Sequence, residues 1–249
     1  MRTDKPAPPQ DLGPFDGILL VDKPSGPTSH DLVADIRRRF GIKKVGHGGT
    51  LDPMATGLMI ILTGKGTKIS ESVMGFDKVY EGVMHLGITT DTQDSDGKVL
   101  TQADAGQITR EQLEGEMRKL LGDTMQIPPM VSAIKQNGVP LYKLARKGQT
   151  VEREPRLIHI YRFALLDYAP PLARFELKCT KGTYVRTLCA DIGTALNCGA
   201  HLKELRRTQI GSLNVTKAIP MDRLMSLSPA ELESTIVPIR NFSIQDIDQ

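Results

Sequence analysis

Apolar and charged side chains alternate strictly along residues 174–180, and this stretch limits the folds open to the chain. Phe175, Leu177 and Cys179 would share one face of a strand, with charged residues on the other face. Such alternation is typical of a strand buried on one side only. Helical patterns and shorter apolar runs precede and follow it in no regular order. The sequence therefore predicts an α+β protein with a mixed, mostly antiparallel sheet.

Local signals place several further elements. Two capping boxes, Thr28 with Asp31 and Thr109 with Gln112, predict helices over residues 29–40 and 109–121. We expect a strand at residues 78–86, a turn at Asn137-Gly138 and short helices at residues 141–147 and before Leu196. The alternation at residues 174–180 is expected to continue through residues 181–186, which would put Tyr184 and Arg186 on one face.

Composition excludes several protein classes. A chain of 249 residues fits one large domain or two small ones. Its longest strongly apolar run, residues 58–62, is far shorter than the roughly 18 to 20 residues of a membrane helix. Three cysteines without a C-x-x-C pair argue against a disulfide scaffold and a cysteine zinc site, and indicate a cytoplasmic protein. Residues 1–15 read as a flexible, proline-rich leader, neither signal peptide nor anchor.

The net charge of +3 conceals an uneven distribution. Residues 30–70 carry 7 basic and 3 acidic side chains, residues 135–186 carry 11 and 4, and residues 201–217 carry 4 and 1. If the fold gathers these segments, they form a patch for a polyanion. Ordinary variation along a solvated surface explains the pattern equally well.

Three motifs fail on inspection. Gly64-Lys65-Gly66-Thr67 lacks the spacing of a nucleotide-phosphate loop. Residues 92–103 lack the first and last carboxylates of a calcium loop, and the five histidines show no metal-ligand spacing. No metal or other cofactor is therefore expected.

The glycine-rich loop at residues 46–53 (GHGGTLDP) is the strongest candidate site. Its glycines permit a tight turn close to a ligand, and Asp52 stands at its end. Asp52 alone could simply cap the next segment. The nearby cations Lys43 and Lys44, an arginine at position 186 that could hold a carboxylate, and a tyrosine at position 80 that could stack on a nucleobase favour a functional reading.

Seven blocks together carry a family resemblance. They are residues 23–29, 44–57, 78–80, 87–97, 128–135, 181–186 and 199–207. In these blocks the chain closely resembles the bacterial tRNA pseudouridine synthases of the TruB family, which convert uridine 55 in the TΨC loop. The resemblance implies the pseudouridine synthase fold, in which helices flank a central sheet and the active site lies in a central cleft.

The resemblance also implies roles for individual residues. Asp52 matches the catalytic aspartate, Tyr80 the tyrosine that stacks on the target base, and Arg186 the arginine that pairs with the carboxylate. The matching supporting residues are Tyr184, His47 and Leu205. The expected RNA contacts are Lys23, Lys43, Lys44, Lys135, Arg146, Lys181, Arg206 and Arg207.

The expected organisation is a catalytic domain at residues 16–217, with an RNA-clamping insertion at residues 127–148. Residues 218–249 would be a short tail in place of a full C-terminal RNA-binding (PUA) domain. The expected partner is the T-arm of tRNA, bound by a monomer without a protein partner. Alternatives are a tRNA-refolding chaperone, a synthase acting on another RNA, and a nucleoside hydrolase.

Overall fold

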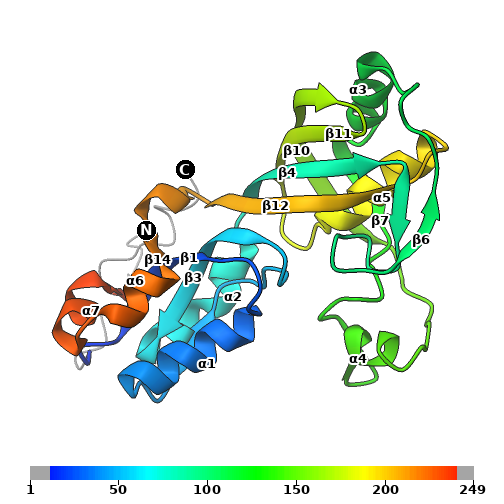
Figure 1. Cartoon of the computed structure of the whole chain (residues 1–249). Coiled ribbons are helices and arrows are strands. Elements are labelled where there is room, and N and C mark those ends of the chain that lie inside the picture. Colours follow the sequence, from blue (N-terminus) through cyan, green and yellow to red (C-terminus); the bar gives the residue numbers. More distant parts are fainter. Residues whose placement is uncertain (1–11, 240–249) are drawn as a thin grey trace, which may run out of the picture. The chain divides into compact units, whose positions relative to one another are not determined.

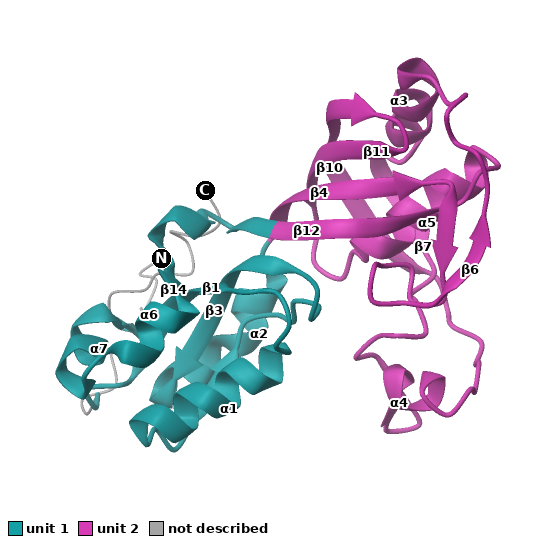
Figure 2. Ribbon diagram, in the orientation of Figure 1, with its two compact units in different colours: residues 1–76, 207–249 teal, residues 77–206 magenta. Residues whose placement is uncertain are grey.

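The computed structural model describes residues 12–239, which form two compact units. Within the described residues, unit 1 combines residues 12–76 with residues 207–239, and unit 2 comprises residues 77–206 (Figure 2). Each unit consists of a sheet with helices, and antiparallel pairs predominate, so the predicted α+β class is confirmed. No helix among residues 12–239 has the length and apolar character needed to span a membrane.

The sheet of unit 1 is mixed. Its strands run in the order β14-β1-β3-β12, with β2 beside β3, β13 beside β12 and β15 beside β1. β1 pairs antiparallel with β3 and parallel with β14. The strand bounds are β1 Gly17–Lys23, β2 Val45–His47, β3 Thr56–Thr63, β12 Ala200–Ile210, β13 Leu213–Asn214, β14 Ile219–Pro220 and β15 Val237–Pro238.

Apolar residues of β1, β3 and β12 build the core of this unit. Ile18, Leu58, Ile60 and Ile210 are almost completely buried in one cluster. All residues of β3 after Thr56 are buried, which is why its sequence reads as a continuous apolar run rather than an alternating one. The strand that leads out of the candidate loop is therefore fixed by packing on both faces.

The helices of unit 1 follow their sequence signals. The capping box of α1 (Ser29–Phe40) is present, with Thr28 as N-cap, and Gly41 ends the helix in the left-handed conformation at φ 66°. The remaining helices are the short elements η1 Gly64–Ile69, α2 Ser70–Gly75, η2 Val215–Lys217, α6 Met221–Ser226 and α7 Pro229–Thr235 (Figure 1).

The C-terminal segment is integrated into unit 1. β14 and β15 both pair with β1, and α6 contacts β1 as well. Leu224 and Leu232 of α6 and α7 are fully buried. The predicted boundary at residue 217 therefore does not coincide with a structural boundary, because residues 218–239 complete the same sheet. The last ten residues and most of the predicted leader lie outside the described residues.

The main sheet of unit 2 runs in the order β12-β4-β11-β10-β7. β4 pairs antiparallel with β11, β11 with β10, and β10 with β7. A separate hairpin joins β5 and β6. The bounds are β4 Lys78–Leu86, β5 Ile88–Thr90, β6 Val99–Gln102, β7 Gly122–Gln126, β10 Arg156–Ala169 and β11 Leu172–Cys179.

The alternation that predicted β11 is confirmed. Phe175, Leu177 and Cys179 are at most 1% exposed, whereas Arg174 and Lys178 are exposed. The predicted continuation of the strand through residues 181–186 is wrong, because Tyr184 is the N-cap of helix α5 (Val185–Ala195). Tyr184 and Arg186 thus begin a helix instead of sharing a strand face. Helix α3 (Arg110–Lys119) starts at the predicted capping box and contacts β10 and α5.

The predicted insertion forms a small substructure of unit 2 between β7 and β10. It contains β8 (Lys135–Gln136), β9 (Val139–Pro140) and α4 (Leu141–Ala145). Asn137 and Gly138 both have positive φ, at 50° and 79°, which makes them the tight turn between β8 and β9. In Figure 2 this substructure projects from the sheet of unit 2.

Candidate active site

The loop that carries Asp52 connects β2 to β3 in unit 1. Gly48 donates its N–H to the carbonyl of Ile60 at 2.8 Å, and a Cβ at Gly48 would lie 2.2 Å from Cγ1 of Val73. Gly49 has a φ of 135°, which L-residues rarely adopt. The loop therefore needs both glycines to follow this path. Asp52, which is partly exposed at its end, accepts the N–H of Ala55 at its carbonyl at 3.1 Å.

Buried polar side chains fix the loop by hydrogen bonds to its backbone carbonyls. The ammonium of Lys23 donates to the carbonyls of Pro24, Pro53 and Ala55 at 2.7–3.0 Å. Lys23 and Arg207 are 0% and 1% exposed. Their predicted role as RNA contacts does not fit this geometry, because their charged groups are occupied by backbone carbonyls inside unit 1.

His47 lies at the start of the same loop. Its Nδ1 accepts the N–H of Gly49 at 3.3 Å, so the proton of the neutral ring resides on Nε2. The rings of His47 and His30 meet edge to face at 5.4 Å between centroids. Burial, and then the positive charge of His30 and Arg207, lower the pKa of His47 from 6.5 to about 4. His47 is therefore neutral at neutral pH and carries its N–H donor on Nε2.

This shifted pKa predicts an acid-dependent loss of stability. Between pH 6.5 and about 4 the unfolded chain binds a proton at His47 and the folded chain does not, so the free energy of unfolding falls as the pH drops. The variant His47→Asn, which keeps an acceptor near Gly49 but cannot titrate, should show a shallower fall. Denaturant unfolding across this pH range checks the difference. Parallel curves for the two proteins would contradict it.

Tyr80, Tyr184 and Leu205 lie in unit 2. Tyr80 is on β4 and is 8% exposed; Leu205, on β12, is 7% exposed. The side-chain amide of Gln126 clamps Tyr184, because its oxygen accepts the N–H of Tyr184 at 2.8 Å and its nitrogen donates to the carbonyl at 3.0 Å. The start of α5 is therefore tied to the end of β7.

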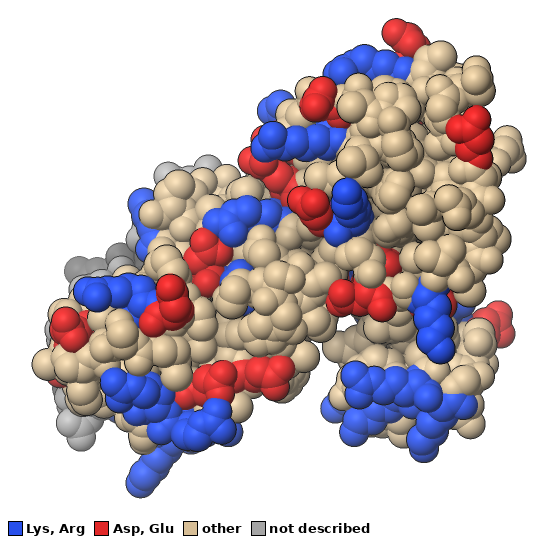
Figure 3. Space-filling model, in the orientation of Figure 1, with Lys and Arg blue, Asp and Glu red and all other residues tan. Residues whose placement is uncertain are grey.

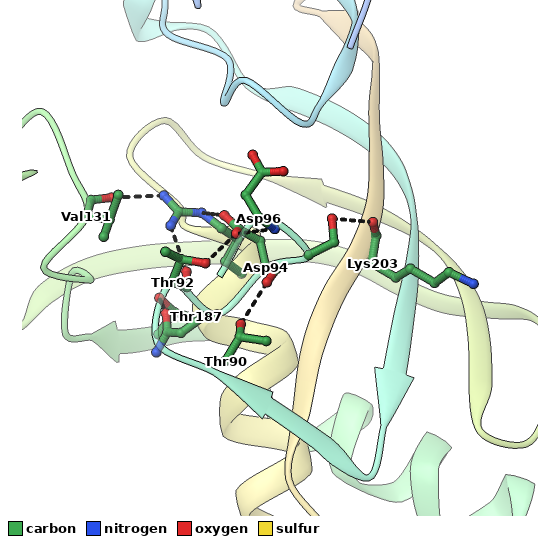
Figure 4. Close-up of polar contacts among 10 residues, drawn as sticks. Thr90, Thr92, Asp94, Asp96, Val131, Thr187 and Lys203 are labelled. Carbon is green, nitrogen blue, oxygen red and sulfur yellow. Dashed lines mark hydrogen bonds and ion pairs between the residues drawn. The ribbon is translucent and has the colours of Figure 1, made fainter. Parts of the chain in front are cut away.

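Arg186 is the centre of a buried network in unit 2. Its guanidinium donates to the carbonyls of Thr92 at 2.9 Å and Val131 at 3.0 Å, and its Nε lies 3.5 Å from a carboxylate oxygen of Asp94. Figure 4 shows Thr92, Asp94 and Val131 around this guanidinium. The side chains of Arg186 and Asp94 are 3% and 7% exposed.

Sequence reasoning singled out Arg186 but gave no role to Asp94, which it considered only within the failed calcium loop and the resemblance block at residues 87–97. No local sequence signal points to Asp94, because the need for an anion arises only from the burial of Arg186 in the fold. The predicted pairing of Arg186 with Asp52 joins residues of different units and stays a prediction.

Two family models together match residues 37–241 of the chain. The N-terminal domain model of the TruB family pseudouridylate synthases matches residues 37–185. The chain belongs to the TruB family. A second model, the tRNA pseudouridylate synthase B C-terminal domain, matches residues 186–241.

Curated TruB relatives agree with this assignment. A tRNA pseudouridine synthase B of Opitutus terrae is 51% identical over 90% of this chain and 93% of its own length. The enzyme of the same name from Syntrophotalea carbinolica is 46% identical over 90% of this chain and 74% of its own.

Solved structures support the fold. A chain in the crystal structure of a Cbf5-Nop10-Gar1 complex is 27% identical with a TM-score of 0.71; the match covers 92% of this chain and 61% of that one. A chain of an H/ACA ribonucleoprotein bound to a substrate RNA containing 2′-deoxyuridine is 26% identical with a TM-score of 0.66, over 89% of this chain and 56% of the other. The pseudouridine synthase fold predicted from the TruB resemblance is thereby confirmed.

The other predicted RNA contacts of this TruB chain lie at the surface. Lys43, Lys44, Lys135, Arg146 and Lys181 are exposed, and Arg206 is partly exposed. Figure 3 shows a dense group of basic side chains on the insertion at residues 127–148, which contains α4. Lys135, Lys143, Arg146 and Lys147 of this insertion are all exposed. Among residues 12–239, no three His, Cys, Asp or Glu side chains are placed to hold a metal ion.

Proposed function

We propose that this chain isomerises uridine 55 in the TΨC loop of tRNA to pseudouridine, with Asp52 as the essential carboxylate. The observation that carries the proposal is the 51% identity, over 90% of the chain, to a relative named tRNA pseudouridine synthase B. The anchored loop supports it, because a catalytic carboxylate must be held in one position. Synthases that act on other RNAs remain the alternative reading.

The chemistry asks little more than accurate placement of groups. The N-glycosidic bond breaks, the uracil turns, and a carbon–carbon bond to the same ribose forms, so the atoms before and after are identical. One ionised carboxylate can start this sequence by attacking the base, attacking the sugar or removing a sugar proton. We assign this part to Asp52, and the TruB resemblance assigns to Arg186 the pairing with its carboxylate.

The target base must leave its stack before it can react. Flipping out a nucleotide costs a few kcal/mol. Tyr80 is assigned to stacking on the flipped base, and the TruB resemblance assigns supporting roles to Tyr184, Leu205 and His47. Contacts from exposed lysines and arginines to RNA phosphates, especially from the α4 insertion, offset the cost. We infer that the protein binds the T-arm as a monomer in the cytoplasm.

The proposal predicts cofactor-independent modification of an unmodified tRNA transcript at one position. Purified protein and transcript are incubated without additions, and pseudouridine is mapped by carbodiimide labelling and primer extension. One new stop in the TΨC loop is expected. A stop elsewhere would indicate a synthase for another site, and salt-sensitive binding without any stop would indicate an RNA chaperone. Release of free uracil from uridine would indicate a hydrolase.

A further inference from the structure

Arg207 reaches the candidate loop from strand β12. Its Nε donates to the carbonyl of Leu58 at 2.8 Å, Nη1 to that of Thr50 at 3.1 Å and Nη2 to that of Gly49 at 3.3 Å. Gly49 and Thr50 shortly precede Asp52, and Leu58 lies in β3 beyond it. One buried guanidinium therefore ties both ends of the loop together.

Ser29 holds the remaining residue before Asp52. Its hydroxyl donates to the carbonyl of Leu51 and accepts the N–H of the same residue, both at 2.9 Å. Ser29 is the first residue of α1 and is 1% exposed. Three consecutive carbonyls ahead of Asp52 are thus bound by buried side chains. The cation Arg207 binds those of Gly49 and Thr50, and the neutral hydroxyl of Ser29 binds that of Leu51.

The position of Arg207 is itself fixed by close packing. A Cβ at Gly57 would lie 2.3 Å from the backbone oxygen of Arg207 and 2.8 Å from its nitrogen. The backbone of β12 at Arg207 therefore lies directly on the glycine at the exit of the loop. This close approach sets where the guanidinium enters the loop.

The energetics favour a mechanical role for these contacts. Hydrogen bonds from a charged donor are stronger than neutral ones, and a buried carbonyl that loses its donor is left with an uncompensated desolvation penalty. A lysine cannot supply three donors in the fixed geometry of a guanidinium. Displacing a reacting group by about 1 Å can cost about a hundredfold in rate.

We propose that Arg207 is a positioning residue for Asp52, with Ser29 as its uncharged counterpart, and that Arg207 does not contact RNA. This inference rests on the proposed function, because the position of Asp52 is read out as the rate of pseudouridine formation. It reassigns a residue that the sequence placed among the RNA contacts.

Two variants of the full chain test the inference, Arg207→Lys and Ser29→Ala. Arg207→Lys should lower the single-turnover rate at saturating enzyme by about a hundredfold. Ser29→Ala should lower the same rate as well. The Kd for tRNA should stay within about twofold, with an unchanged slope of log Kd against log salt. Lys135→Ala is the matched contrast, since loss of a phosphate contact weakens binding and reduces that slope by about 0.7–0.9.

The opposite pattern would overturn the inference: an unchanged saturated rate in Arg207→Lys, or weaker binding with a reduced salt slope. Thermal unfolding establishes whether each variant is folded. If Arg207→Lys does not fold, the rate and binding of Ser29→Ala decide the test. Hydrogen exchange at the Leu51 amide is an independent readout that should accelerate in both variants. If the wild-type protein forms no pseudouridine, the proposed function fails. The positioning role of Arg207 and Ser29 can still be refuted in that case, by hydrogen exchange at the Leu51 amide that is the same in both variants as in the wild type.

Discussion

Replacing Asp52 by asparagine is expected to abolish pseudouridine formation while leaving tRNA binding nearly intact. The substitution keeps the size and shape of the side chain but removes its negative charge and replaces one acceptor oxygen by an NH2 donor. The loop should persist, because Lys23 and Arg207 bind its backbone carbonyls, which the substitution leaves unchanged. Loss of a group that starts a covalent rearrangement lowers rates by about 10⁴-fold or more.

The measurement is single-turnover modification of a tRNA transcript, alongside a filter-binding Kd. Asp35→Asn is the matched control, since Asp35 lies on helix α1 of the same unit and pairs with Arg38 at the surface. Surface pairs of this kind contribute little, so this variant should modify tRNA normally. Residual turnover within tenfold of wild type in Asp52→Asn would remove Asp52 from the catalytic role.

Features set by neighbouring residues could be predicted from the sequence. The capping boxes at Thr28 and Thr109 and the turn at Asn137-Gly138 depend on contacts within a few residues, and all are confirmed. The alternating strand β11 is confirmed for the same reason, because a period of two reports one buried face directly.

Features set by distant residues could not be predicted in this way. Nothing near Arg207 in the sequence shows that its guanidinium is surrounded by carbonyls of residues 49–58, so it read as a surface cation. The start of α5 at Val185 depends on Gln126, which clamps Tyr184 from another strand. The integration of residues 218–239 into unit 1 likewise depends on pairing with β1, two hundred residues earlier.

The second large effect is expected at Arg186. Its guanidinium serves the carbonyls of Thr92 and Val131 and the carboxylate of Asp94 at once. A lysine keeps the charge but offers one ammonium on a flexible stem, so it cannot satisfy three acceptors that lie in different directions. Arg186→Lys should therefore lower the modification rate by about a hundredfold or more, because it releases the carbonyl of Val131, which lies in the segment at residues 127–148 that we propose clamps the RNA.

Asp94→Asn tests how much of the rate loss in Arg186→Lys comes from weakening the buried ion pair. Removing one partner of a buried ion pair typically costs about 3–5 kcal/mol, so the free energy of unfolding should fall by that order. Asp96→Asn is the matched control, since Asp96 is exposed two residues away and should change stability little. Denaturant unfolding and single-turnover rates are measured for all three variants. If Asp94→Asn were as stable as Asp96→Asn, or if Arg186→Lys modified tRNA at the wild-type rate, the buried network would have no such role, because both effects require Arg186 to be held by Asp94.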